Sequence, residues 1–489
     1  IEQLPHLDIE QHLLHILKFP AVASKKFLIT IGDRTVTGLV YRDQFIGNKQ
    51  IPVSDYAATL DDYESYSGQV ISIGEKPAIA IANPEASTRM ALAEALTNIA
   101  GIKHQSLAHI ALSANWMSST KSSDERGDLL RGVQAVTNLA DYLNVAIPVG
   151  KDSLSMKTMW NDGQERSVTS PMTLNISAFS NVEDLRSSVT PELSEKDSVL
   201  LHVWINEGDF RMGGSCLYQS YNLYGGTTPD VDNPEKLKRL FNATQKMLAK
   251  KFITAMHDIS DGGLLTTLFE MALCSGKGLN IHLDEADREK LIPLLFSEEI
   301  GLVMEVPNEH LKEVKEYFTK KDLYFKEIAK KSDKPHMKIF NYKEEIFSKD
   351  LSELYIVWDE MSYKIQSMRD NIDSAESERN AFLNNDKYLT PKINFDIPTT
   401  KGGLFNAKPK VALLREQGIN GQYDMAAALM AAGFEVVDIH MSEIGNNVKS
   451  LEQFSGLVVP GGFSYGDVLG AGNGMAKTIM FKPKLRKKI

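Results

Sequence analysis

Runs of strand-forming residues alternate with helical stretches through residues 27–180, and this alternation constrains the possible fold more than any other feature of the sequence. The four expected strands are KPAIAIANP (76–84), HIALSANW (109–116), VAIPVGKDS (145–153) and TLNISAF (173–179). Between the first two, residues 88–100 repeat apolar side chains at the spacing of a helix with one buried face. The pattern predicts an α/β domain.

A polar, proline-marked stretch at residues 181–197 ends this domain. A new apolar run, SVLLHVWI (198–205), follows it and is the expected first strand of a second domain. The chain has 489 residues, and because single hydrophobic cores stop growing at about 250 to 300 residues, more than one domain is expected. We place the first domain at residues 1–185 and the second at residues 186–347.

Residues 348–407 are rich in charge, and we interpret them as a linker that holds one helix at 361–382. After the linker the sequence has a β-α-β pattern, with expected strands at 410–414, 435–439 and 456–460. Strands that are connected through a helix pair in parallel. Residues 408–489 are therefore predicted to form a third domain with a parallel sheet. We expect that sheet to be unfinished, because the chain stops about 30 residues after its third strand.

Charge and cysteine content exclude several classes of protein. The formal net charge of −10 argues against nucleic acid as a partner, since phosphate binding needs a concentrated basic surface. The two cysteines, Cys216 and Cys274, are too few for a disulfide framework and favour a reducing, cytoplasmic location. The uncharged, apolar stretch at residues 425–434 is far shorter than the roughly 20 residues that span a bilayer. The basic end, KPKLRKKI, is interpreted as a solvated tail.

Glu94 and Asn98 lie one turn apart on the expected helix, away from its apolar stripe. A carboxylate and an amide oxygen placed in this way can both ligate Mg²⁺, which prefers oxygen donors. The alternative is a solvated helix face, which is the commoner setting for these two residue types.

The segment HDISDGG, residues 257–263, precedes another helix with an apolar stripe. Asp258 could ligate Mg²⁺, and the paired glycines could offer backbone N–H groups to a phosphate. In the alternative, the segment is a capping loop in which Asp261 accepts from free helix amides. No base partner is predicted for His257, for which we favour a structural role. Asp55, in IPVSDYA, is uninformative by itself, and Cys274 is expected in the core.

Eight motifs, taken in order, resemble the single-chain form of the formylglycinamide ribonucleotide amidotransferase family. They are RTVTGLVYRDQFIGNKQIPVSDYA, YSGQVISIGEKP, ALAEALTNIA, LSANWM, IPVGKDSLSMKT, HDISDGGLL, VALLREQGINGQYDMAAAL and GGFSYGDVLGAG. The resemblance extends over nearly the whole chain. It implies the second half of the ligase, with two domains like those of aminoimidazole ribonucleotide synthetase, followed by an incomplete flavodoxin-like class I glutamine amidotransferase domain.

The resemblance also implies a reaction and its ligands. Members of the family activate formylglycinamide ribonucleotide with ATP and amidate it with ammonia released from glutamine, in de novo purine biosynthesis. Carried over by position, Asp55, Glu94, Asn98 and Asp258 are expected Mg²⁺ ligands, and Ser54 and Ser260 are expected to contact ATP or ADP. The other half of the same enzyme is the expected protein partner.

The sequence departs from the family pattern in ways that limit the expected activity. The glutaminase nucleophile and its partners would lie beyond GGFSYGDVLGAG, so the loop at Gly461 and Gly462 is expected to have no nucleophile to serve. We assign no catalytic residue and expect the isolated chain to be inactive. Two alternatives remain: another enzyme of the superfamily, such as aminoimidazole ribonucleotide synthetase or thiamine phosphate kinase, and a nucleotide-binding scaffold or paralogue.

Overall fold

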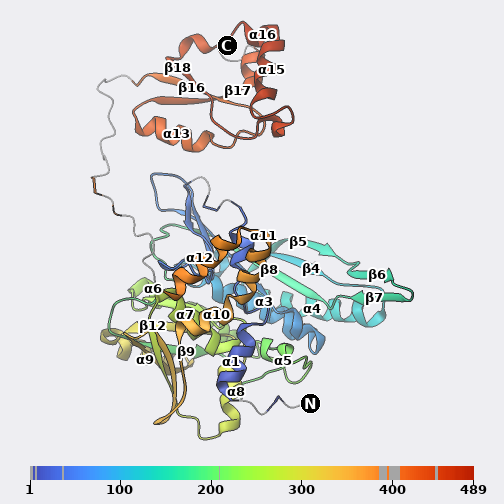
Figure 1. Ribbon diagram of the computed structural model, residues 1–489, viewed down its shortest axis with the longest axis vertical. Coiled ribbons are helices and arrows are strands. Elements are labelled where there is room, and N and C mark those ends of the chain that lie inside the picture. Colours follow the sequence, from blue (N-terminus) through green and yellow to red (C-terminus); the bar gives the residue numbers. More distant parts are fainter. Residues whose placement is uncertain are drawn as a thin grey trace. The chain divides into compact units, whose positions relative to one another are not determined.

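The computed structural model describes residues 4–5, 8–32, 34–35, 38–208, 210–384, 392, 394–395, 408–446 and 450–489. The chain divides into two compact units (Figure 1). The larger unit consists of Ile1–Arg34 and Val40–Thr390, and the smaller one of Thr35–Leu39 and Pro391–Ile489. Among the described residues, no helix is both long and apolar enough to cross a membrane.

The first lobe of the larger unit, residues 40–182, is a six-stranded sheet covered by two helices. Its strands follow the order β1 (Val40–Arg42), β2 (Ala57–Leu60), β3 (Gly68–Glu75), β8 (Thr173–Val182), β4 (Ala111–Met117) and β5 (Ala146–Ser153). Only β4 and β5 pair in parallel among these neighbours. The covering helices are α3 (Pro84–Ile99) and α4 (Ser123–Leu143). A hairpin of β6 (Lys157–Asn161) and β7 (Glu165–Thr169) projects from the lobe with every residue exposed (Figure 1).

One expected strand of this lobe is wrong. Residues 76–84 form the 3₁₀ helix η1 (Pro77–Ile81) and lead into α3, because Pro77 fixes the backbone at the start of one helix and Pro84 at the start of the next. The Asn83 side chain accepts from the backbone N–H of Ala86 and caps α3. The other three strands predicted for this lobe are present as β4, β5 and β8.

The second lobe, residues 198–383, is built on a seven-stranded sheet with a hydrophobic core on each face. Its strands follow the order β10 (Ala255–Asp258), β12 (Gly301–Pro307), β9 (Ser198–Trp204), β13 (Tyr324–Ser332), β11 (Gly278–Leu283), β14 (His336–Asn341) and β15 (Glu344–Asp350). Leu201 and Leu302 belong to the core that also holds α3 of the first lobe. Leu200 and Val303 face the opposite core. The two lobes therefore share one hydrophobic core and are packed as a single unit.

Helices line both faces of the second sheet. They are α6 (Pro234–Lys250), α7 (Gly263–Ser275), α8 (Leu291–Phe296) and α9 (Asn308–Lys320), with the short segments α2 (Lys26–Ile29), η2 (Leu107–His109), α5 (Cys216–Ser220) and η3 (Arg288–Lys290) elsewhere in the unit.

Much of the expected linker is folded. Its described part contains α10 (Leu351–Trp358), α11 (Glu360–Arg369) and α12 (Ile372–Leu383), so the single helix expected at 361–382 is two helices. Leu354, Trp358 and Phe382 are buried in the same core as α7. The first helix of the chain, α1 (Ile9–Leu17), packs there too, on the second lobe and not the first. Both segments therefore contribute to the second lobe.

The smaller unit is a three-stranded parallel sheet, as the sequence predicts. Its order is β17 (Glu435–His440), β16 (Lys410–Arg415), β18 (Gly456–Val458). Around it lie α13 (Gln422–Ala431), α14 (Met441–Gly445), η4 (Leu451–Gln453), η5 (Ser464–Asp467), α15 (Asn473–Phe481) and α16 (Pro483–Arg486). No residue of α13 is buried, and the core is small, centred on Leu414, Ile439 and Met475.

Candidate functional site

The loop between β10 and α7 carries the first group of site residues. His257 and Asp258 end β10, and α7 starts at Gly263. Gly263 has φ +80°, and a Cβ there would lie 2.6 Å from the backbone carbon of Phe296, so only glycine fits. The backbone N–H of Gly262 donates to Glu298 (3.0 Å) and that of Gly263 donates to the Ser260 carbonyl (2.9 Å). The N–H groups that the sequence suggested for phosphate binding therefore already have acceptors in the protein.

His257 lies between two carboxylates, which corrects the prediction that it has no base partner. Its Nδ1 is 2.5 Å from Asp55 Oδ1, and its Nε2 is 2.8 Å from Glu270 Oε2. Burial alone would lower the pKa of His257, but the Asp55 and Glu270 carboxylates outweigh it and raise that pKa well above the usual value. The ring is therefore a buried imidazolium that bridges Asp55 of the first lobe to α7 of the second.

Asp258 and Ser260 complete this group. Asp258 Oδ1 is 3.5 Å from His257 Nδ1, and the Ser260 hydroxyl is 3.3 Å from Asp258 Oδ1. Burial raises the pKa of Asp258 to about 7, and the nearby Asp55 adds to the rise, while His257 opposes it. The carboxyl oxygens of Asp55 and Asp258 and one nitrogen of His257 all lie within 4.8 Å of one another.

A second group surrounds Lys76, which follows β3 directly. Its ammonium is 2.9 Å from Glu94 Oε1, 2.5 Å from Asp261 Oδ1 and 3.8 Å from Glu298 Oε2. Burial alone would lower the pKa of Lys76, but the Asp261, Glu94 and Glu298 carboxylates raise it well above the usual value. Burial raises the pKa of Glu94 to about 8, against the opposing effect of Lys76. Asp261 thus serves as an ion-pair partner and not as the cap of α7, whose first turn has no side-chain cap.

The two groups form one electrostatic cluster. The charges of Asp258 and Asp261 both act on Glu94, and the charge of Lys76 acts on Asp258. We call this set the carboxylate cluster; it consists of Asp55, Glu94, Asp258, Asp261, Glu270 and Glu298 around Lys76 and His257. Carboxyl groups outnumber the cations that they contact, and this surplus of acidic groups accompanies the raised pKa values of Asp258 and Glu94. Oxygen donors with such a surplus fit a hard cation such as Mg²⁺.

The expected site residues differ in whether their side chains contact the carboxylate cluster. Asp55, Asp258 and Ser260 lie in the group around His257, and Glu94 lies in the group around Lys76. Ser54 lies beside Asp55 and donates to the Tyr56 carbonyl (2.8 Å). Asn98, one turn beyond Glu94 on α3, donates its amide to the Ile73 carbonyl (2.8 Å). The sequence patterns did not identify Lys76, Glu270 and Glu298 as site residues. Lys76 directly follows a strand, but a lysine at that position does not by itself indicate a binding site.

Neither cysteine is placed as a nucleophile. Cys274 lies in the buried face of α7, as expected, and burial raises the pKa of its thiol. Cys216 is buried at the start of α5, where its backbone N–H donates to Glu298 (2.8 Å) and burial raises the pKa of its thiol well above the usual value. Both thiols therefore stay protonated at neutral pH.

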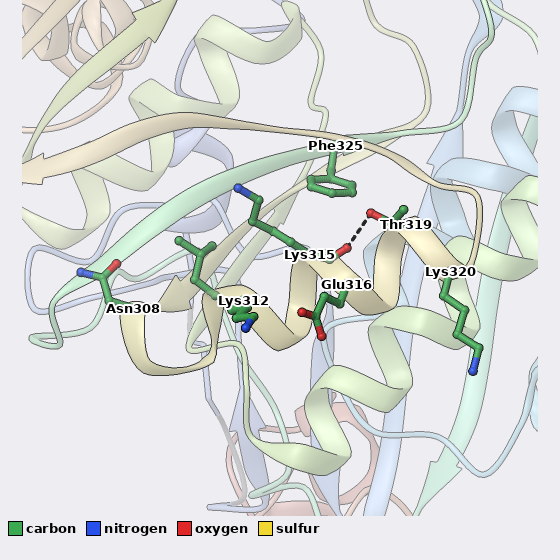
Figure 2. A pocket seen from close by; sticks show the side chains of 8 residues that line it. Asn308, Lys312, Lys315, Glu316, Thr319, Lys320 and Phe325 are labelled. Carbon is green, nitrogen blue, oxygen red and sulfur yellow. Dashed lines mark hydrogen bonds between the residues drawn. The ribbon is translucent and has the colours of Figure 1, made fainter.

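A surface cavity of about 720 Å³ lies elsewhere, on α9 and the start of β13. Figure 2 shows its lysines, Lys312, Lys315 and Lys320, directed away from one another along the helix. Thr319 donates to the Lys315 carbonyl (2.9 Å), as in an ordinary helix. No carboxylate of the cluster lines this cavity, so we take the buried cluster as the candidate site.

We expect the metal-free protein to lose thermal stability as pH rises from about 4 to about 8. The pKa values of Asp258 (about 7) and Glu94 (about 8) lie above those of the unfolded chain, so the folded state holds more protons in this window and rising pH favours unfolding. The melting temperature should fall by roughly 5 °C. Asp258→Asn cannot ionise and should flatten the curve. An equally steep fall in that variant would contradict the assignment.

Family models match three successive parts of the chain. Residues 24–181 match the FGAR-AT PurM_N-like domain, and residues 203–340 match the C-terminal domain of AIR synthase related proteins. Residues 408–489 match the CobB/CobQ-like glutamine amidotransferase domain. The chain is a PurM-like two-domain unit followed by part of a glutamine amidotransferase domain. This confirms the mixed α/β fold class, and the carboxylate cluster lies between the two domains of the PurM-like unit.

Two solved structures with TM-scores of 0.50 or more share a fold over 71% of this chain. T. maritima PurL complexed with FGAR has a TM-score of 0.53 and 13% identity, over 71% of this chain and 53% of that chain. PurLQS from Thermotoga maritima has a TM-score of 0.50 and 14% identity, over 71% and 51%. T. maritima PurL complexed with ATP has a TM-score of 0.49 and 14% identity, over 71% and 52%. The chain thus spans about half the length of the structures that it matches, and at these identities the likeness concerns the fold alone.

Proposed function

We propose that the PurM-like unit binds a magnesium–nucleotide complex at the carboxylate cluster. The observation that carries the proposal is that Asp55 of the first lobe and Asp258 of the second place carboxyl oxygens within 4.8 Å of each other, while the charge of Asp258 also acts on Glu94 of the first lobe. Buried carboxylates persist only when paired or bound to cations, and here the contacting side-chain cations are too few. A metal ion supplies the missing positive charge, and the phosphates of the nucleotide would complete its coordination.

Each of these residues would have a separate role in binding the metal or the nucleotide. Asp55, Glu94 and Asp258 hold Mg²⁺, with Asn98 one turn beyond Glu94 as a further oxygen donor, and Ser54 and Ser260 contact the nucleotide. Bound Mg²⁺ neutralises phosphate oxygens and fixes their orientation. His257 contacts Asp55 through Nδ1 and Glu270 through Nε2, and these two contacts hold the Asp55 carboxylate in one orientation. The donor set consists of hard oxygens, which is what this ion prefers.

We propose further that the chain is the second half of the ligase part of a formylglycinamide ribonucleotide amidotransferase, with the start of its glutaminase. The order of the three matched domains supports this, as does the fold shared with a PurL that was solved with FGAR. The complete enzyme would amidate formylglycinamide ribonucleotide with ATP and ammonia derived from glutamine, in the cytoplasm. The isolated chain would bind nucleotide without turnover, and the remaining half of the enzyme would be its partner.

A nucleotide-binding scaffold is the second candidate. It requires nucleotide binding but no catalytic residue, and we assign none among the residues that the structure describes. Mixing the chain with the amino-terminal half of a complete family member separates the two candidates. Amidine formation from added ammonia supports the ligase, and a mixture that binds nucleotide but forms no amidine supports the scaffold.

Magnesium with ADP at about 100 times its dissociation constant should raise the melting temperature of the chain by roughly 5 °C. The shift should require Mg²⁺ and should vanish in Asp258→Ala, which removes a ligand. Asp162→Ala, at the exposed β6–β7 turn, is the matched control and should keep the full shift. A wild-type chain that shows no shift with millimolar magnesium and ADP contradicts the proposed function.

A further inference from the structure

Lys76 occupies the place that a cation would take among the carboxylates. Resting on the proposed function, we infer that its ammonium is a built-in substitute for the metal: it holds Glu94 while the site is empty, and it exchanges that carboxylate for the nucleotide's phosphates when the magnesium complex binds. Lys76 would then be a positioning residue that makes the site favour a metal–nucleotide complex over a free metal ion.

The backbone around Lys76 is fixed, so its side chain has a definite target. Lys76 follows the last residue of β3, and its carbonyl accepts from the Ser87 hydroxyl of α3 (2.7 Å). Its side chain is only 6% exposed. From this anchor the ammonium reaches Glu94 of its own lobe and both Asp261 and Glu298 of the other. It is therefore a contact between the lobes at the centre of the cluster.

The three carboxylates that contact Lys76 are not equally free to move. Glu298 Oε1 accepts from the backbone N–H groups of Cys216 and Gly262, so this carboxylate is held by the second lobe. The Asp261 side chain is 41% exposed, so it can turn to solvent. Glu94 Oε2 accepts from the backbone N–H of Glu75 (2.6 Å), and its other oxygen contacts Lys76. Glu94 can therefore serve a metal fully only when Lys76 withdraws from that oxygen.

The ammonium of Lys76 should have opposite effects on the binding of a bare metal ion and on the binding of a metal–nucleotide complex. An ammonium beside the ligand oxygens repels a bare divalent cation and competes with it for Glu94. The same ammonium attracts polyphosphate, for which lysine is a common partner. A metal ion that arrives with a nucleotide gives Lys76 a new anion in exchange for Glu94, whereas a metal ion that arrives alone does not.

The test measures both ligands on variants of the full chain. Lys76→Met should bind Mn²⁺ alone about 10-fold more tightly than wild type, measured by electron paramagnetic resonance, and should bind ADP with Mg²⁺ about 10-fold more weakly, measured by calorimetry. Lys76→Gln keeps a hydrogen-bond donor for Glu94 and replaces the methionine variant in the test if that variant does not fold. It should likewise bind Mn²⁺ more tightly and ADP with Mg²⁺ more weakly than wild type. The control is Lys236→Met, which removes another buried lysine. Lys236 lies on α6 and pairs with Glu207, and its loss should change neither affinity.

Opposite changes for the two ligands support the exchange. Parallel losses mean that Lys76 only holds the fold together and overturn the inference, as do two unchanged affinities. These outcomes differ from failure of the proposed function, in which the wild-type chain itself binds neither Mn²⁺ nor the magnesium complex of ADP.

Discussion

Replacing His257 with leucine should lower the free energy of unfolding by about 3 to 5 kcal/mol at neutral pH. The imidazolium contacts Asp55 and Glu270 within 2.8 Å, and all three side chains are almost fully buried. Its loss leaves two carboxylates in the interior without their cation, which is the costly way to break a buried ion pair. Denaturant unfolding at pH 7 and at pH 5 measures the effect. The loss should be smaller at pH 5, where the carboxylates take up protons more readily.

His202 provides the matched control, because it is a buried histidine in the same sheet without a carboxylate contact. Burial lowers the pKa of His202 to about 3, so the ring is neutral, and it stacks on Trp204 at 4.8 Å. His202→Leu should therefore cost less than about 1.5 kcal/mol, as for an apolar exchange of similar volume. Equal losses in both leucine variants would mean that shape, and not charge, explains the role of His257.

Part of the candidate site could be read from the sequence because its residues stand in local patterns. Glu94 is visible as a carboxylate on the polar side of a helix, and Asp258 as an acid beside paired glycines at a helix start. Lys76, Glu270 and Glu298 carry no such pattern. Their role arises from the packing of one lobe on the other, which brings together residues up to about 220 positions apart in the chain. The sequence therefore indicates the carboxylates that stand in local patterns better than the charged side chains that contact them.

The fold was predictable where apolar runs match one strand or one helix face. Strands β4, β5, β8 and β9 and the parallel sheet of the smaller unit follow from such runs. The run at 76–84 misled, because its alternation of small apolar residues resembles a strand while Pro77 and Pro84 favour helix starts. The expected linker misled for the opposite reason: its many charges lie on exposed faces and hide the buried side of α10 and α12.

Trp358→Ala in α10 should lower the free energy of unfolding of the larger unit by about 3 to 5 kcal/mol, which a linker residue would not do. Trp358 is 2% exposed, packs edge-on against Phe269 of α7 at 6.1 Å, and donates from Nε1 to the Val22 carbonyl (2.8 Å). Alanine leaves a cavity and an unpaired buried carbonyl at once. Trp160→Ala is the control, since Trp160 is 46% exposed on the β6–β7 hairpin and its loss should cost less than about 0.5 kcal/mol. If Trp358→Ala unfolds at the same denaturant concentration as wild type, residues 351–383 do not contribute to the core, and the charged segment is a linker after all.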